Sequence, residues 1–224
     1  MDNWYSLRTA IIHKKYDEAL SLLQKFSKGI ISDRRTFYSS LLVLVNEGYV
    51  SEVKEIMGNT YSSKSDVDLK RIINNSIFEY EMIQNLTEEQ KDIVDSCIEK
   101  IKEGLRNHEY DLVYDLCEWG YYVSKLPIFL YYEGKCFYRC RKYEIARKIL
   151  LKYVELGSTK VSKAYLYLTR IYDIKDDIQM YFKYKRRIVE TEIVSLDSFY
   201  FYNLLGKTVD RKKNYLQLTT LNSH

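Results

Sequence analysis

Residues that interrupt helices are scarce in this chain. Its 224 residues include only 1 proline and 8 glycines, whereas β-sandwiches and barrels need many such residues in their turns. No run of about 18 uncharged apolar residues occurs, so the sequence offers no candidate for a transmembrane helix. The first residues also lack the basic segment and apolar run of a signal peptide. We therefore expect an all-helical, cytoplasmic protein that does not enter the membrane.

The sequence also lacks the residue groupings on which enzymes and metal proteins depend. The three histidines, His13, His108 and His224, are far apart, so no acid, base and nucleophile can be grouped. Neither of the glycine-rich phosphate-binding motifs, GxGxxG or GxxxxGK[ST], is present. Cys136 and Cys140 are four residues apart, but no nearby histidine completes a ligand set. We expect a protein that catalyses nothing and needs no cofactor or metal.

What the chain does contain is a helical pattern rich in tyrosine. Hydrophobic residues make up 46% and charged residues 29% of the chain, a balance that suits amphipathic helices. The 23 tyrosines each offer a large apolar ring with a polar tip. Two interpretations stay open: codon usage in an AT-rich genome combined with helix packing, or tyrosines that line a binding groove.

The most specific pattern lies at residues 126–157, which read as two antiparallel helices joined by a tight turn. Gly134 and Phe137 fall on the first helix, and Ala146 and Leu150 fall on the second. A small side chain lets the neighbouring helix approach, and a large one fills the space beside it. This spacing resembles the tetratricopeptide repeat (TPR), a family of stacked helical hairpins, and in particular the sensing repeats of bacterial regulatory TPR proteins.

The spacing of the expected turns agrees with this resemblance. Tyr16 and Val50 are 34 residues apart, which is the TPR period, and Tyr110 and Tyr143 are 33 apart. From Val50 to Tyr110 the distance is 60 residues, which indicates an insertion.

Two residues before expected helices have the side chains of N-caps. Asp33 precedes one helix, and Thr87, with Gln90 three residues on, precedes another. These caps place helix starts on both sides of the insertion.

The sequence therefore predicts an all-α fold, a right-handed solenoid of about five TPR-like hairpins in a single domain at residues 1–206. Because one hairpin cannot bury its apolar face alone, the hairpins must stack. The last hairpin matches the pattern least well. In chain order we expect hairpins at 2–29 and 33–60, an inserted helix at 65–84, hairpins at 87–120, 127–157 and 161–190, a capping helix at 195–206 and a polar basic tail at 207–224.

The resemblance also implies where a partner binds, because the first helix of each TPR hairpin lines a concave groove. Arginine and lysine between tyrosine rings suit a peptide or protein partner with acidic and apolar side chains, or the backbone of a single-stranded nucleic acid. The alternative is that these residues are only the solvated, half-packed sides of amphipathic helices. The candidates are Tyr131, Lys135, Tyr138, Arg139, Tyr165, Tyr172, Lys102 and Arg106, with Trp4 and Arg8 in the first hairpin.

Charge is distributed unevenly and gives a second hypothesis. Residues 1–110 hold 15 basic and 18 acidic side chains, whereas residues 111–224 hold 20 and 13. A basic C-terminal patch could contact the phosphates of a nucleic acid, although this excess is mild for such a protein. Self-association through an incompletely capped end is a further alternative. The candidate nucleic-acid contacts are Lys183, Arg186, Arg187, Lys212 and Lys213.

Overall fold

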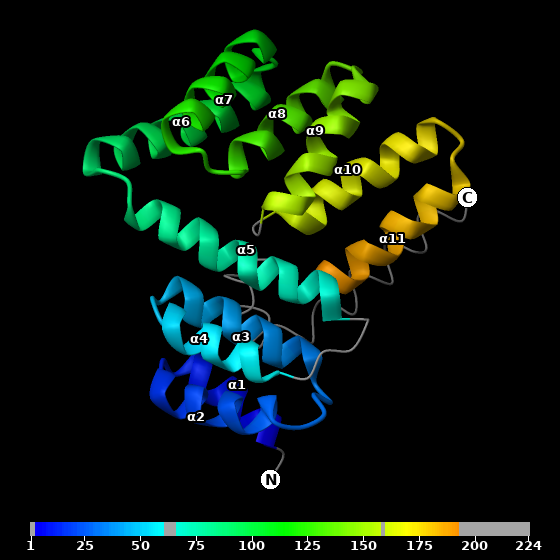
Figure 1. Cartoon of the computed structure of the whole chain (residues 1–224). Coiled ribbons are helices and arrows are strands. Elements are labelled where there is room, and N and C mark those ends of the chain that lie inside the picture. The colour runs from blue at the N-terminus through cyan, green and yellow to red at the C-terminus, as the bar shows by residue number, and fades with distance from the viewer. Residues whose placement is uncertain (1–2, 61–65, 158–159, 193–224) are drawn as a thin grey trace.

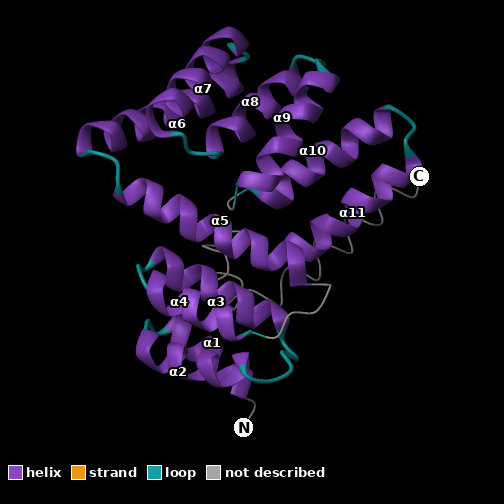
Figure 2. Cartoon of the chain, viewed as in Figure 1, coloured by secondary structure: helices purple, strands orange, loops and turns teal. Residues whose placement is uncertain are grey.

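The computed structural model describes residues 3–60, 66–157 and 160–192, and helices joined by short connections account for nearly all of them (Figures 1 and 2). These described residues contain no strand, so the all-α prediction is confirmed. The expected capping helix at 195–206 and the tail at 207–224 lie outside the described residues. The eleven helices of the described part are α1 (Asn3–Ile12), α2 (Tyr16–Ser27), α3 (Arg34–Asn46), α4 (Val50–Asn59), α5 (Val67–Gln84), α6 (Glu88–Asn107), α7 (Tyr110–Ser124), α8 (Ile128–Arg139), α9 (Tyr143–Leu156), α10 (Val161–Ile174) and α11 (Ile178–Glu192).

Ten of these helices pack as pairs of chain neighbours. The pairs are α1 with α2, α3 with α4, α6 with α7, α8 with α9 and α10 with α11. Successive pairs also pack on one another, since α1 and α2 contact α3 and α4, α7 contacts α8, and α9 contacts α10. The arrangement is that expected of a helical repeat, whereas the number of repeats and the handedness of the solenoid stay predictions.

The turn inside each pair has the same backbone form. One residue has a positive φ, namely Lys14 (57°), Gly48 (93°), His108 (64°), Arg141 (60°) or Asp176 (54°). The next residue donates its N–H to the carbonyl five positions earlier, at 2.9 or 3.0 Å in all five turns. This is the longer hydrogen bond of a Schellman motif, which ends one helix and turns the chain back.

Close approach of helix backbones in the second half of the chain depends on glycine. A Cβ added to Gly134 of α8 would lie 2.7 Å from Cγ of Leu150 on α9. One added to Gly120 of α7 would lie 2.2 Å from the ring of Phe129 on α8. Leu150 and Phe129 are both fully buried, so neither side chain has free space to move into.

Helix α5 belongs to no pair and joins the two groups of helices. In Figure 1 it runs between α1–α4 below and α6–α11 above. It packs on α3 and contacts α11. Asn75 of α5 donates to the backbone carbonyls of Glu155 and Gly157 at 2.9 and 3.1 Å, and Arg71 donates to the hydroxyl of Tyr165 at 2.9 Å. Polar side chains of α5 therefore tie the N-terminal helices to the C-terminal ones.

Other polar contacts hold α1 against the segment that starts α3. Asp33 accepts the backbone N–H of Thr36 at 3.0 Å, as the sequence predicted for a helix cap. Arg8 pairs with the same carboxylate and donates to the hydroxyl of Thr36 at 2.7 Å, while Trp4 donates to Ser32 at 2.8 Å. Arg8 and Trp4, expected at the groove, therefore connect the first two pairs.

We predict that Gly134→Ala lowers the free energy of unfolding by about 1–3 kcal/mol, because the added methyl group overpacks the contact with Leu150. Urea denaturation measures the change. The control is Gly58→Ala in α4, where a Cβ meets nothing within 4 Å. That variant should be neutral or more stable by up to about 1 kcal/mol. Equal effects of the two substitutions would contradict the close packing of α8 on α9.

Candidate functional site

A cavity of about 360 Å³ opens between the first helices of the last three pairs. Its walls come from α6, α8 and α10, which contact one another in the order α6, α8, α10. Four of its lining side chains are lysines and three are tyrosines, and no acidic residue is among the lining residues that the structure describes. We call this the lysine cavity. It is lined by Lys102, Tyr131, Tyr132, Lys135, Lys160, Lys163, Leu166 and Tyr167.

Helical spacing brings the lysine cavity's residues together. Tyr131 and Lys135 are four residues apart on α8, and Lys163 and Tyr167 are four apart on α10, so each pair shares one helix face. The ring centroid of Tyr167 lies 6.4 Å from that of Tyr131 and 4.9 Å from that of Tyr138. Tyrosine rings therefore connect α8 to α10 along the cavity wall.

Lys135 is held in an unfavourable environment for a cation. Partial burial lowers the pKa of Lys135, and the positive charges of Arg139, Lys163 and Lys160 lower it further. Burial and like charges both penalise the protonated form of lysine. An anion bound in the lysine cavity would offset both effects, so the cavity is suited to a negatively charged ligand.

Three of the eight predicted partner-binding residues, Lys102, Tyr131 and Lys135, line the lysine cavity. Tyr138 is half-buried next to it, with its ring 5.6 Å from Tyr143. Two others, Arg139 and Arg106, do not line the cavity. The guanidinium of Arg139 donates to the carbonyl of Leu105 and so ties α8 to α6. Arg106 is exposed in the last turn of α6 and does not line the cavity.

Tyr165 and Tyr172, the remaining two, are buried where α10 meets α11. Their exposed fractions are 0% and 6%. The ring of Tyr184 on α11 lies 5.7 Å from Tyr165 and stacks on Tyr172 at 5.4 Å. The hydroxyl of Tyr165 accepts hydrogen bonds from Arg71 at 2.9 Å and from Arg187 at 3.2 Å. Because α5 and α11 cover this side of α10, these tyrosines are part of the core.

The sequence interpretation missed Tyr132 on α8, Lys160 directly before α10, and Lys163, Leu166 and Tyr167 on α10. A strict 34-residue period places Leu168 opposite Gly134 and so selects Tyr165 and Tyr172. The sequence nevertheless contains a pattern that could have identified three of these residues. Lys160, Lys163 and Tyr167 are separated by three and four residues, which makes a stripe along one face of a helix.

Some of the basic residues proposed to contact nucleic acid make contacts within the chain. Arg187 lies 3.6 Å from the carboxylate of Asp68 and donates to Tyr165, so it joins α11 to α5. Arg186 also has an interaction within the chain. Lys183 is exposed and lies 5.7 Å from the ring centroid of Tyr184. Lys212 and Lys213 lie outside the described residues.

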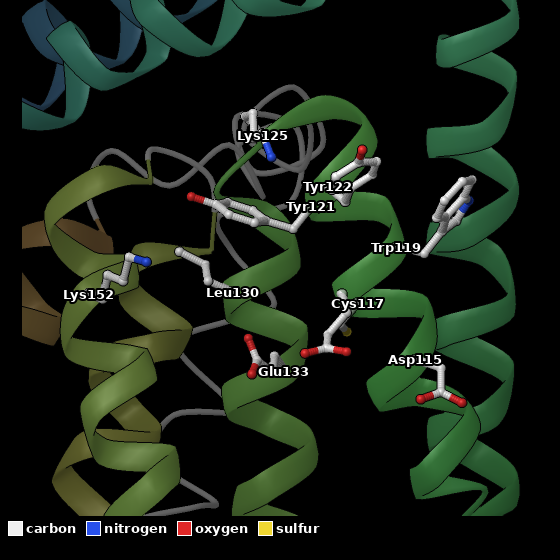
Figure 3. Close-up of a pocket in the computed structure, with 10 residues that line it drawn as sticks. Asp115, Cys117, Trp119, Tyr121, Tyr122, Lys125, Leu130, Glu133 and Lys152 are labelled. Atoms are coloured by element: carbon white, nitrogen blue, oxygen red, sulfur yellow. The ribbon is translucent and has the colours of Figure 1, made fainter.

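A second, larger cavity of about 750 Å³ lies between α7, α8 and α9 (Figure 3). Its lining combines aromatic rings with side chains of both charges. Burial raises the pKa of Glu133, as does the charge of Glu118, while Lys152 lowers it. We call this the aromatic cavity. It is lined by Asp115, Cys117, Glu118, Trp119, Tyr121, Tyr122, Lys125, Leu130, Glu133 and Lys152.

The four cysteines are free, and three of them are buried. Burial raises the pKa of Cys117, and burial together with the neighbouring Cys140 raises the pKa of Cys136 to about 12. Such thiols stay protonated and unreactive near neutral pH. Within the described residues no group of three or more His, Cys, Asp or Glu side chains is arranged to hold a metal ion.

Comparisons of this chain with protein-family models, with curated proteins and with solved structures give no match. Any function assigned to it therefore rests on its own residues and cavities. In the part of the chain that the structure describes, no helix has the length and apolar character needed to cross a bilayer.

We predict that Tyr165→Phe lowers the free energy of unfolding by about 1–3 kcal/mol, because Arg71 and Arg187 lose a buried acceptor. The control is Tyr184→Phe in the same cluster. The hydroxyl of Tyr184 makes no hydrogen bond to the described residues, so its loss should leave the free energy of unfolding nearly unchanged. Thermal unfolding compares the two. A stable Tyr165→Phe variant would contradict a structural role for this hydroxyl.

Proposed function

We propose that this chain is a non-enzymatic, TPR-like adaptor or regulatory protein that binds an acidic segment of a peptide or protein partner. The segment would lie in the concave groove of a right-handed solenoid, in a cytoplasmic protein. One observation carries the proposal. Three consecutive first helices, α6, α8 and α10, contribute four lysines and three tyrosines to a single cavity.

The side chains of the lysine cavity favour a peptide over a small rigid anion. Lysine is a flexible point charge, so several lysines can follow carboxylates at different places along an extended segment. The ring of Tyr167, which is partly exposed, adds apolar contact area at a low entropic cost, as in many protein interfaces, whereas Tyr131 and Tyr132 are buried. Ammonium groups around this ring therefore suit a segment that has both acidic and apolar side chains.

The energetic cost of the lysine cluster also supports a binding role. Lys135 is half-buried, and the charges that act on it most strongly are positive. A residue selected only for stability at this place would be neutral or paired. Binding sites often retain such costs because the ligand removes them.

We predict that Lys135→Met raises the free energy of unfolding by up to about 1 kcal/mol at neutral pH, because it removes a partly desolvated charge that solvent still screens. The folded-state pKa of Lys135 is lowered, so its protonated form is penalised in the folded state. The advantage of methionine should therefore be largest at neutral pH and should shrink as the pH rises towards 10.5. Denaturation at several pH values measures this trend, and Lys148→Met, at an exposed position on α9, is the control.

The proposed function is tested by selecting binders from a random peptide library and measuring their affinity by fluorescence anisotropy. We expect the enriched peptides to carry Asp or Glu next to aromatic or aliphatic residues. Lys135→Met together with Lys102→Met should weaken their binding at least about tenfold, whereas Lys148→Met should not. Enrichment of peptides without acidic residues, or affinity insensitive to these lysines, would overturn the proposal.

The same measurement separates the alternative occupants. A single-stranded oligonucleotide that binds more tightly than the selected peptides, with an affinity that falls steeply with salt, would support a nucleic-acid-binding protein instead. Light scattering of the free protein shows whether it is a dimer, and a monomer would exclude a second copy of the chain as the occupant of the groove.

A further inference from the structure

The aromatic cavity keeps its acidic and basic side chains apart. Figure 3 shows Asp115 and Glu133 towards one end of the cavity, and Lys125 and Lys152 on either side of Tyr121 towards the other. The acidic end receives side chains from two neighbouring helices, α7 and α8. It is therefore a site built between two helix pairs.

The carboxylates of this cavity are not paired directly with its lysines, although the charge of Lys152 lowers the pKa of Glu133. Among the described residues, Asp115, Glu118 and Glu133 make no ion pair. The lysines instead lie over aromatic rings. Nζ of Lys125 is 4.9 Å from the ring centroid of Tyr122, and Nζ of Lys152 is 5.7 Å from that of Tyr121. Three carboxylates are thus left without a paired cation.

The hydroxyl of Tyr114 lies next to these carboxylates, and its pKa is affected by them. Tyr114 donates its hydroxyl to Glu118 at 2.5 Å. That hydrogen bond raises the pKa of Tyr114 to about 12, together with desolvation and the charges of Glu118, Glu133 and Asp115. Glu133 is itself half-buried. A half-buried carboxylate beside a second one gains free energy when a cation binds between them.

Exposed rings lie next to these carboxylates. Trp119 and Tyr122 on α7 are 52% and 70% exposed, and their rings stack with centroids 6.0 Å apart. Two large rings so exposed on one helix offer contact area for a partner. Their faces attract cations, as Lys125 over Tyr122 already demonstrates.

We propose that the aromatic cavity is a second docking site, which takes an arginine side chain from a basic segment of a protein partner. The carboxylates of Glu118 and Glu133 accept the guanidinium, and the ring of Trp119 or Tyr122 packs against the same side chain. Arginine fits better than lysine because its planar group donates to two carboxylates and stacks on an aromatic ring. The site shares helix α8 with the lysine cavity but differs from it in the charge of its lining and in its ligand.

The experiment uses the full-length chain and a labelled peptide in which two arginines flank one phenylalanine. The reference is the same peptide with citrulline, which is neutral and similar in shape, in place of arginine. In anisotropy titrations we expect Glu118→Gln with Glu133→Gln to weaken binding of the arginine peptide at least about tenfold. The control is Asp95→Asn with Glu99→Gln, two exposed positions on α6, which should leave binding unchanged.

A second measurement reports where the peptide binds. The chain has 2 tryptophans, so Trp4→Phe leaves Trp119 as the single indole probe. The arginine peptide should change Trp119 fluorescence with the same midpoint as the anisotropy. Trp119→Ala should weaken binding even if the glutamine variants fold poorly. Lys135→Met should leave this binding unchanged, so the two cavities are tested independently.

Three outcomes would overturn this proposal. The first is equal affinity for the arginine and citrulline peptides. The second is full binding by both the Trp119→Ala and the glutamine variants. The third is that the arginine peptide binds only after Arg211→Ser, Lys212→Ser and Lys213→Ser are made together. The occupant of the cavity would then be the chain's own basic segment, which these substitutions neutralise.

Discussion

One residue in the left-handed conformation reverses the chain inside every helix pair, at Lys14, Gly48, His108, Arg141 and Asp176. Only one of the five is glycine, so the repeated hydrogen bond across the turn, rather than the residue type, defines this geometry. Because each turn returns the chain in the same way, the first helices come next to one another on either side of α5, α1 with α3 and α8 with both α6 and α10. The contacts of α8 with α6 and with α10 follow from this, and so does the lysine cavity between them.

Local signals predicted the helices well, because they act within a few residues. The N-caps expected at Asp33 and Thr87 are both present, and Thr87 forms the full capping box with Gln90. Lys135 was found because the TPR pattern is strong at Gly134 on α8, and Lys102 was found by applying the same alignment to α6; both line the lysine cavity. On α10 the same alignment selected Tyr165 and Tyr172, which α5 and α11 bury. Contacts between helices that are distant in the chain leave no local pattern in the sequence.

The tyrosines occupy two kinds of position, in the core and at the surface of a cavity, which the sequence does not distinguish. Tyr153 and Tyr165 are fully buried, and the hydroxyl of Tyr165 accepts from two arginines. Tyr122 in the aromatic cavity and Tyr167 in the lysine cavity have the same chemistry but keep part of the ring at the surface. A tyrosine can occupy either place because its ring packs like an apolar side chain while its hydroxyl remains hydrated or hydrogen-bonded. Whether a ring lies in the core or at a cavity depends on how far the neighbouring helix covers it.

Helix α8 contributes to both cavities, and this links their chemistry. Lys135 faces the lysine cavity, and Glu133, two residues earlier, faces the aromatic cavity. Residues two apart project in nearly opposite directions from a helix, so a single helix separates the lysine cavity from the acidic end of the aromatic cavity. An acidic segment on one side and a basic segment on the other would attract each other across α8, since the interior screens charge less than water does. Gly120 and Gly134 let α7 and α9 pack close against α8, so the helix that forms one wall of each cavity is packed between two neighbours.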